Sequence, residues 1–350
     1  MCGNITGGFM RLIAALLLAP SLVAAQLPPG APGARVSDVV APNAADAIRI
    51  EPTQWTVEWG GRPRDPYVAP DGLIYFVGQE GNYIASLDQK SGAMKRFEID
   101  AGTHPHTQIV DKDGTVWYTG NRAAHIGKVD PKTGKVTKYP MPDGTARDPH
   151  TMVFDGKGGI WFTAQGAAYV GRLNMASGKV DLVKFPARTN PYGIVMDKAG
   201  HPWFDLFGTN RIGTIDPATM TPKEYILPDS ARPRRIAMTS DGMIWYSDHA
   251  RGKVGRLNPK TGDVKDWDMP GGRGSRPYAI NADDKDRLWI SETGGPVRRL
   301  VGFDSRQERV FAISDLDPKG GTVRHMMFDG RTREMWFGTD GGTVGKIVVP

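Results

Sequence analysis

Short runs of apolar or alternating residues recur along most of the chain, and turns rich in Gly and Asp separate them. Residues 147–173, RDPHTMVFDGKGGIWFTAQGAAYVGRL, contain three such runs at 151–154, 160–163 and 169–173, and a fourth follows at 180–185. Alternating or aromatic runs of this length are typical of β-strands, and glycine supplies the positive φ of tight hairpin turns. No segment has the periodicity of a long amphipathic helix. The pattern predicts an all-β fold made of four-stranded units.

The same order of signals returns along the chain as a repeat. Each unit opens with a proline or, in the last unit, a valine: Pro66, Pro105, Pro149, Pro191, Pro233, Pro277 and Val323. The successive spacings are 39, 44, 42, 42, 44 and 46 residues, close to the roughly 40 to 45 residues of one propeller blade. We therefore predict a seven-bladed β-propeller domain over residues 48–350.

The two ends of this domain are expected to complete each other. The last unit stops at VGKIVVP, residues 344–350, without an outer strand, whereas IRIEPTQWTVEW, residues 48–59, is strand-like without a blade of its own. Pairing these segments would remove exposed strand edges. We predict a ring closed by an N-terminal strand on the last blade. Because such a ring needs no partner to cover its edges, we expect a monomer.

The N-terminal residues have the features of an export signal. Arg11 is followed by LIAALLLAPSLVAA, which ends in small residues, so we predict a signal peptide over residues 1–25, with translation starting at Met1 or Met10. The apolar run contains a proline and is shorter than the roughly 20 residues of a membrane span, so no span is predicted. Residues 26–47, rich in Pro and Ala, are predicted to be a disordered linker. The expected location is the periplasm or the medium.

Composition excludes two classes of function. The single cysteine, Cys2, lies within the predicted signal peptide, so the mature chain would have neither disulfides nor thiolate chemistry. The 44 basic and 38 acidic residues give a formal charge of +6 without a long Lys/Arg run, so nucleic acid is not an expected partner.

An aromatic residue recurs in the second strand of each unit. The series is Tyr75, Trp117, Trp161, Trp203, Trp245, Trp289 and Trp336. An aromatic stripe can bind sugars or bases, but a fixed place in every repeat favours packing between neighbouring blades. We interpret these residues as core.

Function is expected where the repeats differ. The start of the inner strand and the end of the second strand lie on one face of a blade, so both line one mouth of the central channel. The inner series is Tyr67, His106, His150, Tyr192, Arg234, Tyr278 and Arg324. The second series is Gln79, Asn121, Gln165, Asp205, Asp248, Glu292 and Asp340. These two polar rings predict a site for a small-molecule ligand or substrate on a rigid scaffold.

Several phrases of the chain resemble the streptogramin B lyase (virginiamycin B lyase) family, among them PHTMVFDGKGGIWFTAQGAAYVGRL, NPYGIVMDKAGHPWF and KVGRLNPKTGDVKDWDMP. The resemblance covers residues 48–350. It implies a seven-bladed propeller, and its founding enzymes open a cyclic depsipeptide at its ester linkage by elimination, with a bound magnesium ion.

The family's catalytic residues are replaced at their expected places, GTVRHMM and RPYAIN. By the resemblance, Arg324 stands for the catalytic histidine, Tyr278 for a second histidine and Thr322 for an acidic metal ligand, whereas Asp340 matches the other acidic ligand. His325 is one residue late, so its side chain is expected on the opposite face of the strand. The original site is therefore absent from its blades.

A rotated version of the site is predicted on the second and third blades, where DPH at 148–150 repeats the family's acid-Pro-His pattern. His150 would be the general base and His106 would orient the substrate or return a proton. Asp148, Gln165 and Asp340 are the candidate ligands of Mg²⁺, although Gln165 is a weaker ligand than a carboxylate. The candidate substrate-binding residues are Tyr67, His104, Tyr192, Arg234, Tyr278 and Arg324.

Three functions remain open at this point, together with a purely structural role in which Asp148 and the two histidines bind loop backbone. The first is a metal-assisted carbon–oxygen lyase acting on a cyclic ester or depsipeptide-like small molecule. The second is a non-catalytic binding or scaffold propeller with a basic mouth, formed by Arg234, Arg235, Arg276 and Arg324. The third, least favoured, is a metal-dependent lactonase, because Asp248, Glu292 and Asp340 are the few acids near the mouth.

Overall fold

The computed structural model describes residues 1, 3, 38, 39, 44–317 and 320–350. Most of the predicted signal peptide and most of the predicted linker lie outside these residues. Within them, the helical segments are three short 3₁₀ turns, η1 (Ala44–Asp46), η2 (Pro142–Gly144) and η3 (Gly272–Ser275). No helix of this part is long and apolar enough to cross a membrane.

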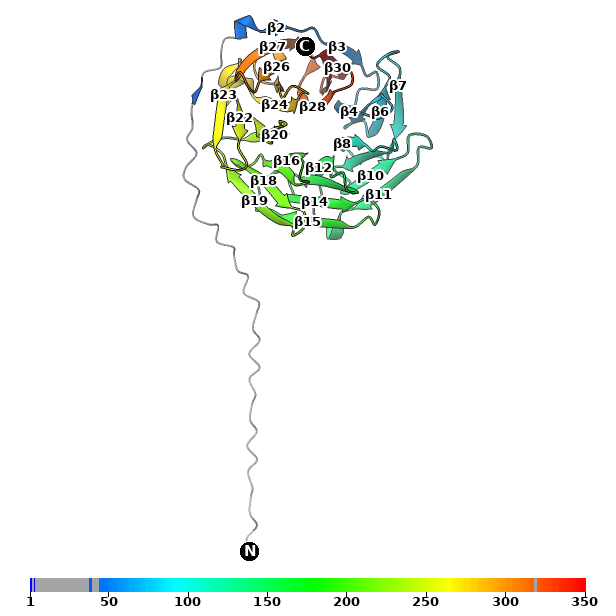
Figure 1. The fold of residues 1–350 in the computed structure, drawn as a ribbon. Coiled ribbons are helices and arrows are strands. Elements are labelled where there is room, and N and C mark those ends of the chain that lie inside the picture. Colours follow the sequence, from blue (N-terminus) through cyan, green and yellow to red (C-terminus); the bar gives the residue numbers. More distant parts are fainter. Residues whose placement is uncertain (2, 4–37, 40–43, 318–319) are drawn as a thin grey trace. The chain divides into compact units, whose positions relative to one another are not determined.

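The strands form seven antiparallel sheets arranged as blades around a ring (Figure 1), which confirms the predicted propeller. Blade 1 holds β4 (Pro63–Val68), β5 (Ile74–Gly78), β6 (Tyr83–Leu87) and β7 (Met94–Glu98). Blade 2 holds β8 (Pro105–Val110), β9 (Val116–Gly120), β10 (His125–Val129) and β11 (Val136–Pro140). Blade 3 holds β12 (Pro149–Phe154), β13 (Gly159–Ala164), β14 (Tyr169–Asn174) and β15 (Val180–Lys184). Blade 4 holds β16 (Pro191–Met196), β17 (Pro202–Leu206), β18 (Arg211–Asp216) and β19 (Thr221–Ile226).

The remaining blades follow the same order. Blade 5 holds β20 (Pro233–Met238), β21 (Ile244–Asp248), β22 (Lys253–Leu257) and β23 (Val264–Asp268). Blade 6 holds β24 (Pro277–Ala282), β25 (Leu288–Glu292), β26 (Arg298–Asp304) and β27 (Arg309–Leu316). Blade 7 holds β28 (Val323–Asp329), β29 (Glu334–Thr339) and β30 (Thr343–Val348), and β3 (Thr53–Thr56) completes it.

The N-terminal segment closes the ring as predicted and then continues over two further blades. β3 pairs antiparallel with β30, with Thr53 opposite Lys346. β2 (Ile48–Arg49) pairs in parallel with the outer strand of blade 6, and β1 (Asp38–Val39) with that of blade 5. The pattern of the sequence predicts residues 48–59 on blade 7 alone and no regular structure before them, so β1 and β2 are additional pairings. A strand edge accepts any extended segment through backbone hydrogen bonds, so these short pairings need no apolar side-chain pattern.

The recurring aromatic residues are buried between blades, as predicted. Trp161 packs with residues of blade 4, and Trp336 packs with residues of blade 1; neither is exposed. A hydroxyl on the second strand adds a polar tie: the Oγ1 atom of Thr119 donates to the carbonyl of His150 in the next blade at 3.0 Å. Equivalent bonds run from Thr163, Ser247 and Ser291 to the next inner strand. The blades are thereby held in fixed positions around the channel.

Candidate functional site

Each inner strand carries a bulge at the mouth of the channel. In β12, Pro149 pairs with Ala164 but Met152 pairs with Phe162, so one extra residue is inserted between them. The same register shift occurs in all seven inner strands. Such bulges redirect side chains and are common beside functional sites. The residues that directly follow the paired Pro or Val are Arg64, His106, His150, Tyr192, Arg234, Tyr278 and Arg324.

This register corrects the prediction for blade 1, where the residue at the mouth is Arg64 and not Tyr67. Pro63 pairs with Gly78, as Pro105 pairs with Gly120, so Pro63 is the equivalent proline. The sequence holds two prolines three residues apart, and the second was taken for the repeat position. Tyr67 instead packs against two apolar clusters, one between blades 1 and 2 and one between blades 2 and 3.

The other predicted residues of the inner ring meet around the channel. The ring centroids of His106 and His150 lie 3.5 Å apart, and those of His150 and Tyr192 lie 4.1 Å apart. The hydroxyls of Tyr192 and Tyr278 contact each other, and the Nη1 atom of Arg324 donates to the Tyr278 hydroxyl at 3.3 Å. The structure therefore brings these side chains into one contiguous site.

The bulge also turns the following residue toward the channel, which corrects the prediction for His325. Its side chain was expected on the opposite face, but the charges of Asp65, Arg235 and Arg64 all act on it. Burial lowers the pKa of His325 to about 4, and the nearby guanidinium groups oppose the favourable effect of Asp65.

Three members of the second predicted ring are out of register. Leu206, the last residue of β17, pairs with Pro191. The residue that directly follows the strand, at the place of Gln79 and Asn121 in other blades, is therefore Phe207 and not Asp205. By the same register, His249 and Thr293 replace Asp248 and Glu292. Asp248 is bound by Arg251, and Glu292 by Arg299.

Asp205 is the last residue but one of β17. It occupies the position at which Thr119 and Thr163 carry the hydroxyl that ties neighbouring blades. Its Oδ2 atom accepts from the Gly193 amide at 2.9 Å, and its side chain is fully buried. Burial raises the pKa of this carboxyl well above its usual range, which favours the neutral form.

The two histidines are almost completely buried, with 4% of His106 and 2% of His150 exposed. Burial lowers the pKa of both imidazoles well below the usual value, and the charges of Arg64 and Arg235 lower it further. Both rings are therefore neutral near pH 7.

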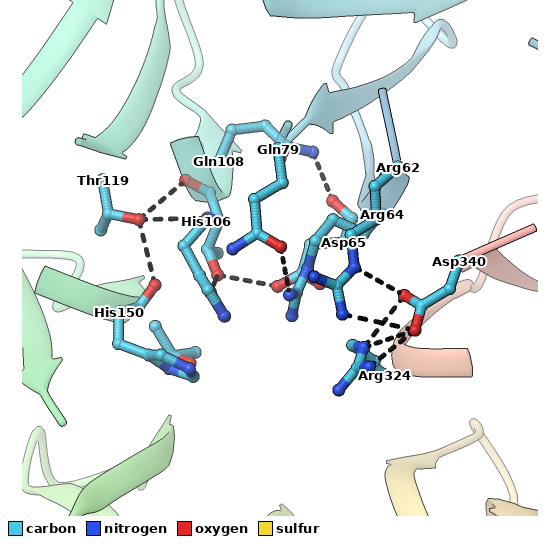
Figure 2. A network of polar contacts seen from close by, with 12 residues as sticks. Arg62, Arg64, Asp65, Gln79, His106, Gln108, Thr119, His150, Arg324 and Asp340 are labelled. Atoms are coloured by element: carbon cyan, nitrogen blue, oxygen red, sulfur yellow. Dashed lines mark hydrogen bonds and ion pairs between the residues drawn. The ribbon is translucent and has the colours of Figure 1, made fainter. Parts of the chain in front are cut away.

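A polar network connects His106 to the floor of the channel (Figure 2). The Thr107 hydroxyl donates to the Oδ2 atom of Asp65 at 2.7 Å, and the Nδ1 atom of His106 lies 3.2 Å from the same hydroxyl. Arg64 donates from Nε to Asp65 at 2.9 Å and from Nη1 to Gln79 at 3.0 Å. Despite burial, Arg64 and Arg235 hold the pKa of Asp65 below its usual range, so this carboxylate is ionised.

Arg235 of blade 5 reaches across the channel and ties three other blades together. Its Nη1 atom donates to Thr151 at 2.9 Å, its Nε atom to the carbonyl of Arg324 at 3.1 Å, and its Nη2 atom lies 3.5 Å from Asp65. The Arg235 side chain is 3% exposed. It therefore links blades 1, 3, 5 and 7 beside the ring of mouth residues.

Arg324 and Arg62 share one carboxylate, that of Asp340. Arg324 donates to it from Nη2 at 2.6 Å, and Arg62 donates from Nε at 3.1 Å. Figure 2 shows both guanidinium groups directed at this carboxylate. Burial would raise the pKa of Asp340, but these bonds hold it below its usual range.

Arg234 has a different environment from the other arginines of the channel. Its guanidinium stacks over Tyr278 at 4.0 Å and over Phe207 at 4.6 Å. Its Nη1 atom lies 2.9 Å from the Nε2 atom of His249, whose Nδ1 atom faces the carbonyl of Pro277 at 3.3 Å. Burial and Arg234 lower the pKa of His249 to about 4, so this imidazole is neutral and accepts the Arg234 bond through Nε2.

The positive charges also act on Tyr278. Burial opposes ionisation of its hydroxyl, but Arg234, Arg64 and Arg324 together lower its pKa to about 8. Its neighbour Tyr192 has a raised pKa, because burial and the nearby Tyr278 both disfavour a second phenolate.

The residues predicted around the rim have structural contacts. Asp148 accepts hydrogen bonds from the amides of Gly166 and Ala167, which fixes the turn after β13. Gln165 accepts from the Ala168 amide through its backbone carbonyl. His104 donates from its own amide to Asn82 at 2.8 Å, and burial lowers the pKa of its imidazole.

The carboxylates of this mouth do not fit a magnesium ion. Asp340 is occupied by two guanidinium groups, and Asp148 by two backbone amides. Asp148 and Gln165 belong to blade 3 and Asp340 follows β29 of blade 7, with blades 1 and 2 between them. In the described part of the chain, no three His, Cys, Asp or Glu side chains gather in a metal-binding cluster. Mg²⁺ prefers free carboxylate oxygens and water.

The sequence analysis did not single out five residues that complete the site: Arg64, Asp65, Thr107, Thr151 and His249. One signal for Arg64 was present, because the tripeptide Arg-Pro-Arg occurs at both 62–64 and 232–234. Aligning the two copies gives the correct register of blade 1. Thr107 and Thr151 also share a signal, because Pro-His-Thr occurs at both 105–107 and 149–151. Asp65 and His249 have no such signal, since they are defined by contacts between blades.

Comparisons with known proteins agree with this architecture. The family model described as Virginiamycin B lyase family matches residues 67–347. A solved streptogramin B lyase is 27% identical, with a TM-score of 0.76, over 85% of this chain and 97% of that one. A catalytically inactive virginiamycin B lyase from Staphylococcus aureus with quinupristin is 23% identical, with a TM-score of 0.76, over 86% of this chain and 100% of that one. Hydrazine synthase of Kuenenia stuttgartiensis shares the fold at 13% identity, with a TM-score of 0.69, over 83% of this chain and 96% of that one. A search of curated proteins gives no match.

The family match spans most of the propeller, from the inner strand of the first blade to the last strand of the chain. The repeat, the bulged inner strands and the ring closure all agree with it. The chain belongs to the virginiamycin B lyase family.

Proposed function

We propose that the mouth of the channel binds a small organic anion, with Arg234 as its main contact. The observation that carries this proposal is the absence of a carboxylate partner for Arg234 among residues 44–317 and 320–350. Arg64 and Arg235 face Asp65, and Arg324 faces Asp340. A partly buried guanidinium without a counter-ion is costly, so this position favours an anionic ligand.

The groups around Arg234 hold its guanidinium in one orientation. Tyr278 and Phe207 fix its plane, and His249 takes the proton of Nη1. The Nε atom is enclosed and has no hydrogen-bond partner in the described structure. Nε is therefore out of reach of a ligand, whereas Nη2 has no partner among the described residues and is not enclosed, so the Nη donors of this planar guanidinium are available to carboxylate oxygens. Pre-orientation reduces the entropy that binding would otherwise cost.

The balance of charge around the mouth supports the same conclusion. The mouth holds five guanidinium groups and three carboxylates that pair with them, Asp65, Asp340 and the exposed Glu80, whereas Asp205 and the histidines favour their neutral forms. The five are Arg62, Arg64, Arg234, Arg235 and Arg324. A mouth with a net positive charge attracts anions and repels divalent cations.

Titration calorimetry with succinate tests this proposal. We expect wild-type protein to bind succinate and the Arg234→Ala variant to bind it at least about tenfold more weakly, as the loss of a charge-assisted hydrogen bond implies. Arg211→Ala is the matched control, because Arg211 pairs with Glu224 between the two outer strands of blade 4, away from the mouth. Equal affinity in wild type and Arg234→Ala, or no binding by the wild type, would contradict the proposal.

A second candidate is elimination at a cyclic ester, which the neutral imidazole pair favours. His106 and His150 are adjacent, and neither is protonated near pH 7, so either ring is able to accept a proton. The arginines of the mouth would stabilise the enolate charge in place of a metal. Screening of cyclic depsipeptides and lactones tests this candidate, with His150→Ala expected to abolish turnover. Turnover that survives His150→Ala, or that depends on added magnesium, would exclude this version of the reaction.

A further inference from the structure

The proton of the His106 ring is located by the network below it. Asp65 is ionised, so it only accepts hydrogen bonds, and the Thr107 hydroxyl donates to it at 2.7 Å. That hydroxyl therefore has no proton left for the Nδ1 atom of His106, 3.2 Å away. The contact forms only when Nδ1 itself carries the proton. His106 then has a free lone pair on Nε2.

The network below His150 has the opposite polarity. The Nη1 atom of Arg235 donates to the Thr151 hydroxyl at 2.9 Å, and a guanidinium has no acceptor. The hydroxyl proton of Thr151 is therefore directed to the other neighbour of its oxygen, the Nδ1 atom of His150, at 2.8 Å. His150 accepts through Nδ1 and carries its own proton on Nε2.

Both Nε2 atoms are free to meet a ligand. Neither has a hydrogen-bond partner in the described structure, and neither is among its fully enclosed, unpartnered polar atoms. The centroids of the two rings are 3.5 Å apart, so a ring with an acceptor nitrogen lies beside a ring with a donor N–H. A hydroxyl group both donates and accepts, and it is the simplest group that satisfies such a pair.

The histidine pair adjoins the proposed anion site. The Tyr192 ring lies 4.1 Å from that of His150, and the Arg234 guanidinium lies 5.8 Å from the Tyr192 ring. Arg234 is also close enough to act on the charge of His150. Only the Tyr192 ring therefore lies between the histidine pair and the guanidinium that would hold the ligand's carboxylate.

We infer that Asp65–Thr107 and Arg235–Thr151 hold His106 and His150 in opposite tautomers, and that this pair selects a hydroxy-carboxylate. The ligand class rests on the proposed function, because Arg234 must hold the carboxylate. The tautomers rest only on the network and are tested without any ligand. The two histidines then have different roles: His106 accepts a hydrogen bond from the ligand through Nε2, and His150 donates one from Nε2.

Long-range ¹H–¹⁵N correlation spectra of protein labelled with ¹⁵N-histidine measure the tautomers directly. At pH 7.5 we expect His106 with its proton on Nδ1 and His150 with its proton on Nε2, with assignments from His106→Asn and His150→Asn. Thr107→Val is expected to change the pattern of His106 alone, and Thr151→Val that of His150 alone. Thr107→Ser and Thr151→Ser keep the hydroxyl and are expected to restore both patterns. The same tautomer in both rings, or unchanged patterns in both valine variants, would overturn the assignment.

Calorimetry with malate and succinate then tests the ligand class, because malate adds one hydroxyl to the same dicarboxylate. We expect wild-type protein to bind malate about tenfold more tightly, the contribution of one or two hydrogen bonds. Thr107→Val and Thr151→Val should lose this preference and keep the affinity for succinate. Equal affinities for malate and succinate in the wild type would overturn the ligand class and leave anion binding intact. An Arg234→Ala variant that binds both acids as the wild type does would instead refute the proposed function.

Discussion

Acidification from pH 7 to pH 5 should strongly destabilise this propeller, because three imidazoles of the channel are buried in neutral form. His106, His150 and His325 are surrounded by the guanidinium groups of Arg64 and Arg235. Their pKa values in the folded state are lowered from the usual 6.5, to about 4 for His325. Below pH 6.5 the unfolded chain binds protons that the folded chain does not. The free energy of unfolding therefore decreases as the pH is lowered.

The expected loss follows from this difference in proton binding. Each histidine that titrates only in the unfolded state costs about 1.4 kcal/mol per pH unit below its unfolded pKa. At pH 5 each would cost about 2 kcal/mol, and the three together about 6 kcal/mol. This is comparable to the whole stability of many domains, about 5 to 15 kcal/mol. Asp65 and Asp340 contribute little to the change, because their lowered pKa values affect stability only below about pH 4. Two other groups act in opposite directions. The lowered pKa of the partly buried His249 adds up to about 2 kcal/mol to the loss, whereas the raised pKa of Asp205 lets the folded state hold a proton that the unfolded state has released and offsets up to about 3 kcal/mol, so the net loss is about 5 kcal/mol.

Urea unfolding at pH 7, 6 and 5 measures the effect. The pH slope should fall by about 1.4 kcal/mol per pH unit in His325→Asn, and His201→Asn controls for the loss of a histidine outside the channel. His201 lies in the turn with Asp197, away from the channel network. A free energy of unfolding that changes by less than about 1 kcal/mol between pH 7 and pH 5 would refute the neutral, buried state of the imidazoles.

Three further predictions concern the N-terminal segment and the rim. Deleting residues 26–61 removes β3 and the stacking of Trp55 on Trp336, whose ring centroids are 5.6 Å apart. Thermal melting should show lower stability, and light scattering should show aggregation at the open edge. A truncated chain as stable and monomeric as the full mature chain would contradict the closure. Asp148→Ala should cost about 1 to 3 kcal/mol in urea unfolding through the loss of two amide bonds; unchanged stability together with weaker magnesium binding would instead assign Asp148 to a metal site. The mature protein is expected to start near Gln26, which N-terminal sequencing of protein from the periplasm or medium measures; residues 1–25 retained on a cytoplasmic protein would exclude export.

The fold was predictable because every blade repeats the same local solution. Trp161 and its equivalents fill the space between blades, and glycines such as Gly158, with φ of +85°, allow the tight hairpins. Both requirements are local in sequence and recur at the blade spacing. The repeat therefore predicted the number of blades, the order of strands and the closure by β3.

The site was only partly predictable because its register depends on the bulge. A single inserted residue turns two successive side chains, such as His150 and Thr151, toward the channel network. Simple alternation along the strand gives the wrong face for His325 and cannot reveal Thr107 or Thr151. Contacts across the channel are harder still, since Arg235 and Asp65 are 170 residues apart in the chain.

The substitution of Arg324 has a consequence for the electrostatics of the whole mouth. The resemblance implies a histidine at this place, near an acidic metal ligand matched by Asp340. Arg324 instead binds Asp340 at 2.6 Å and thereby supplies a fixed positive charge where the family would use a bound cation. Arg62 shares the same carboxylate and also pairs with Glu80, so these two arginines and two carboxylates balance each other, and Arg234 is left without an anion in the described structure. A mouth that has replaced a metal by arginines should retain its ligand affinity in the presence of a chelator.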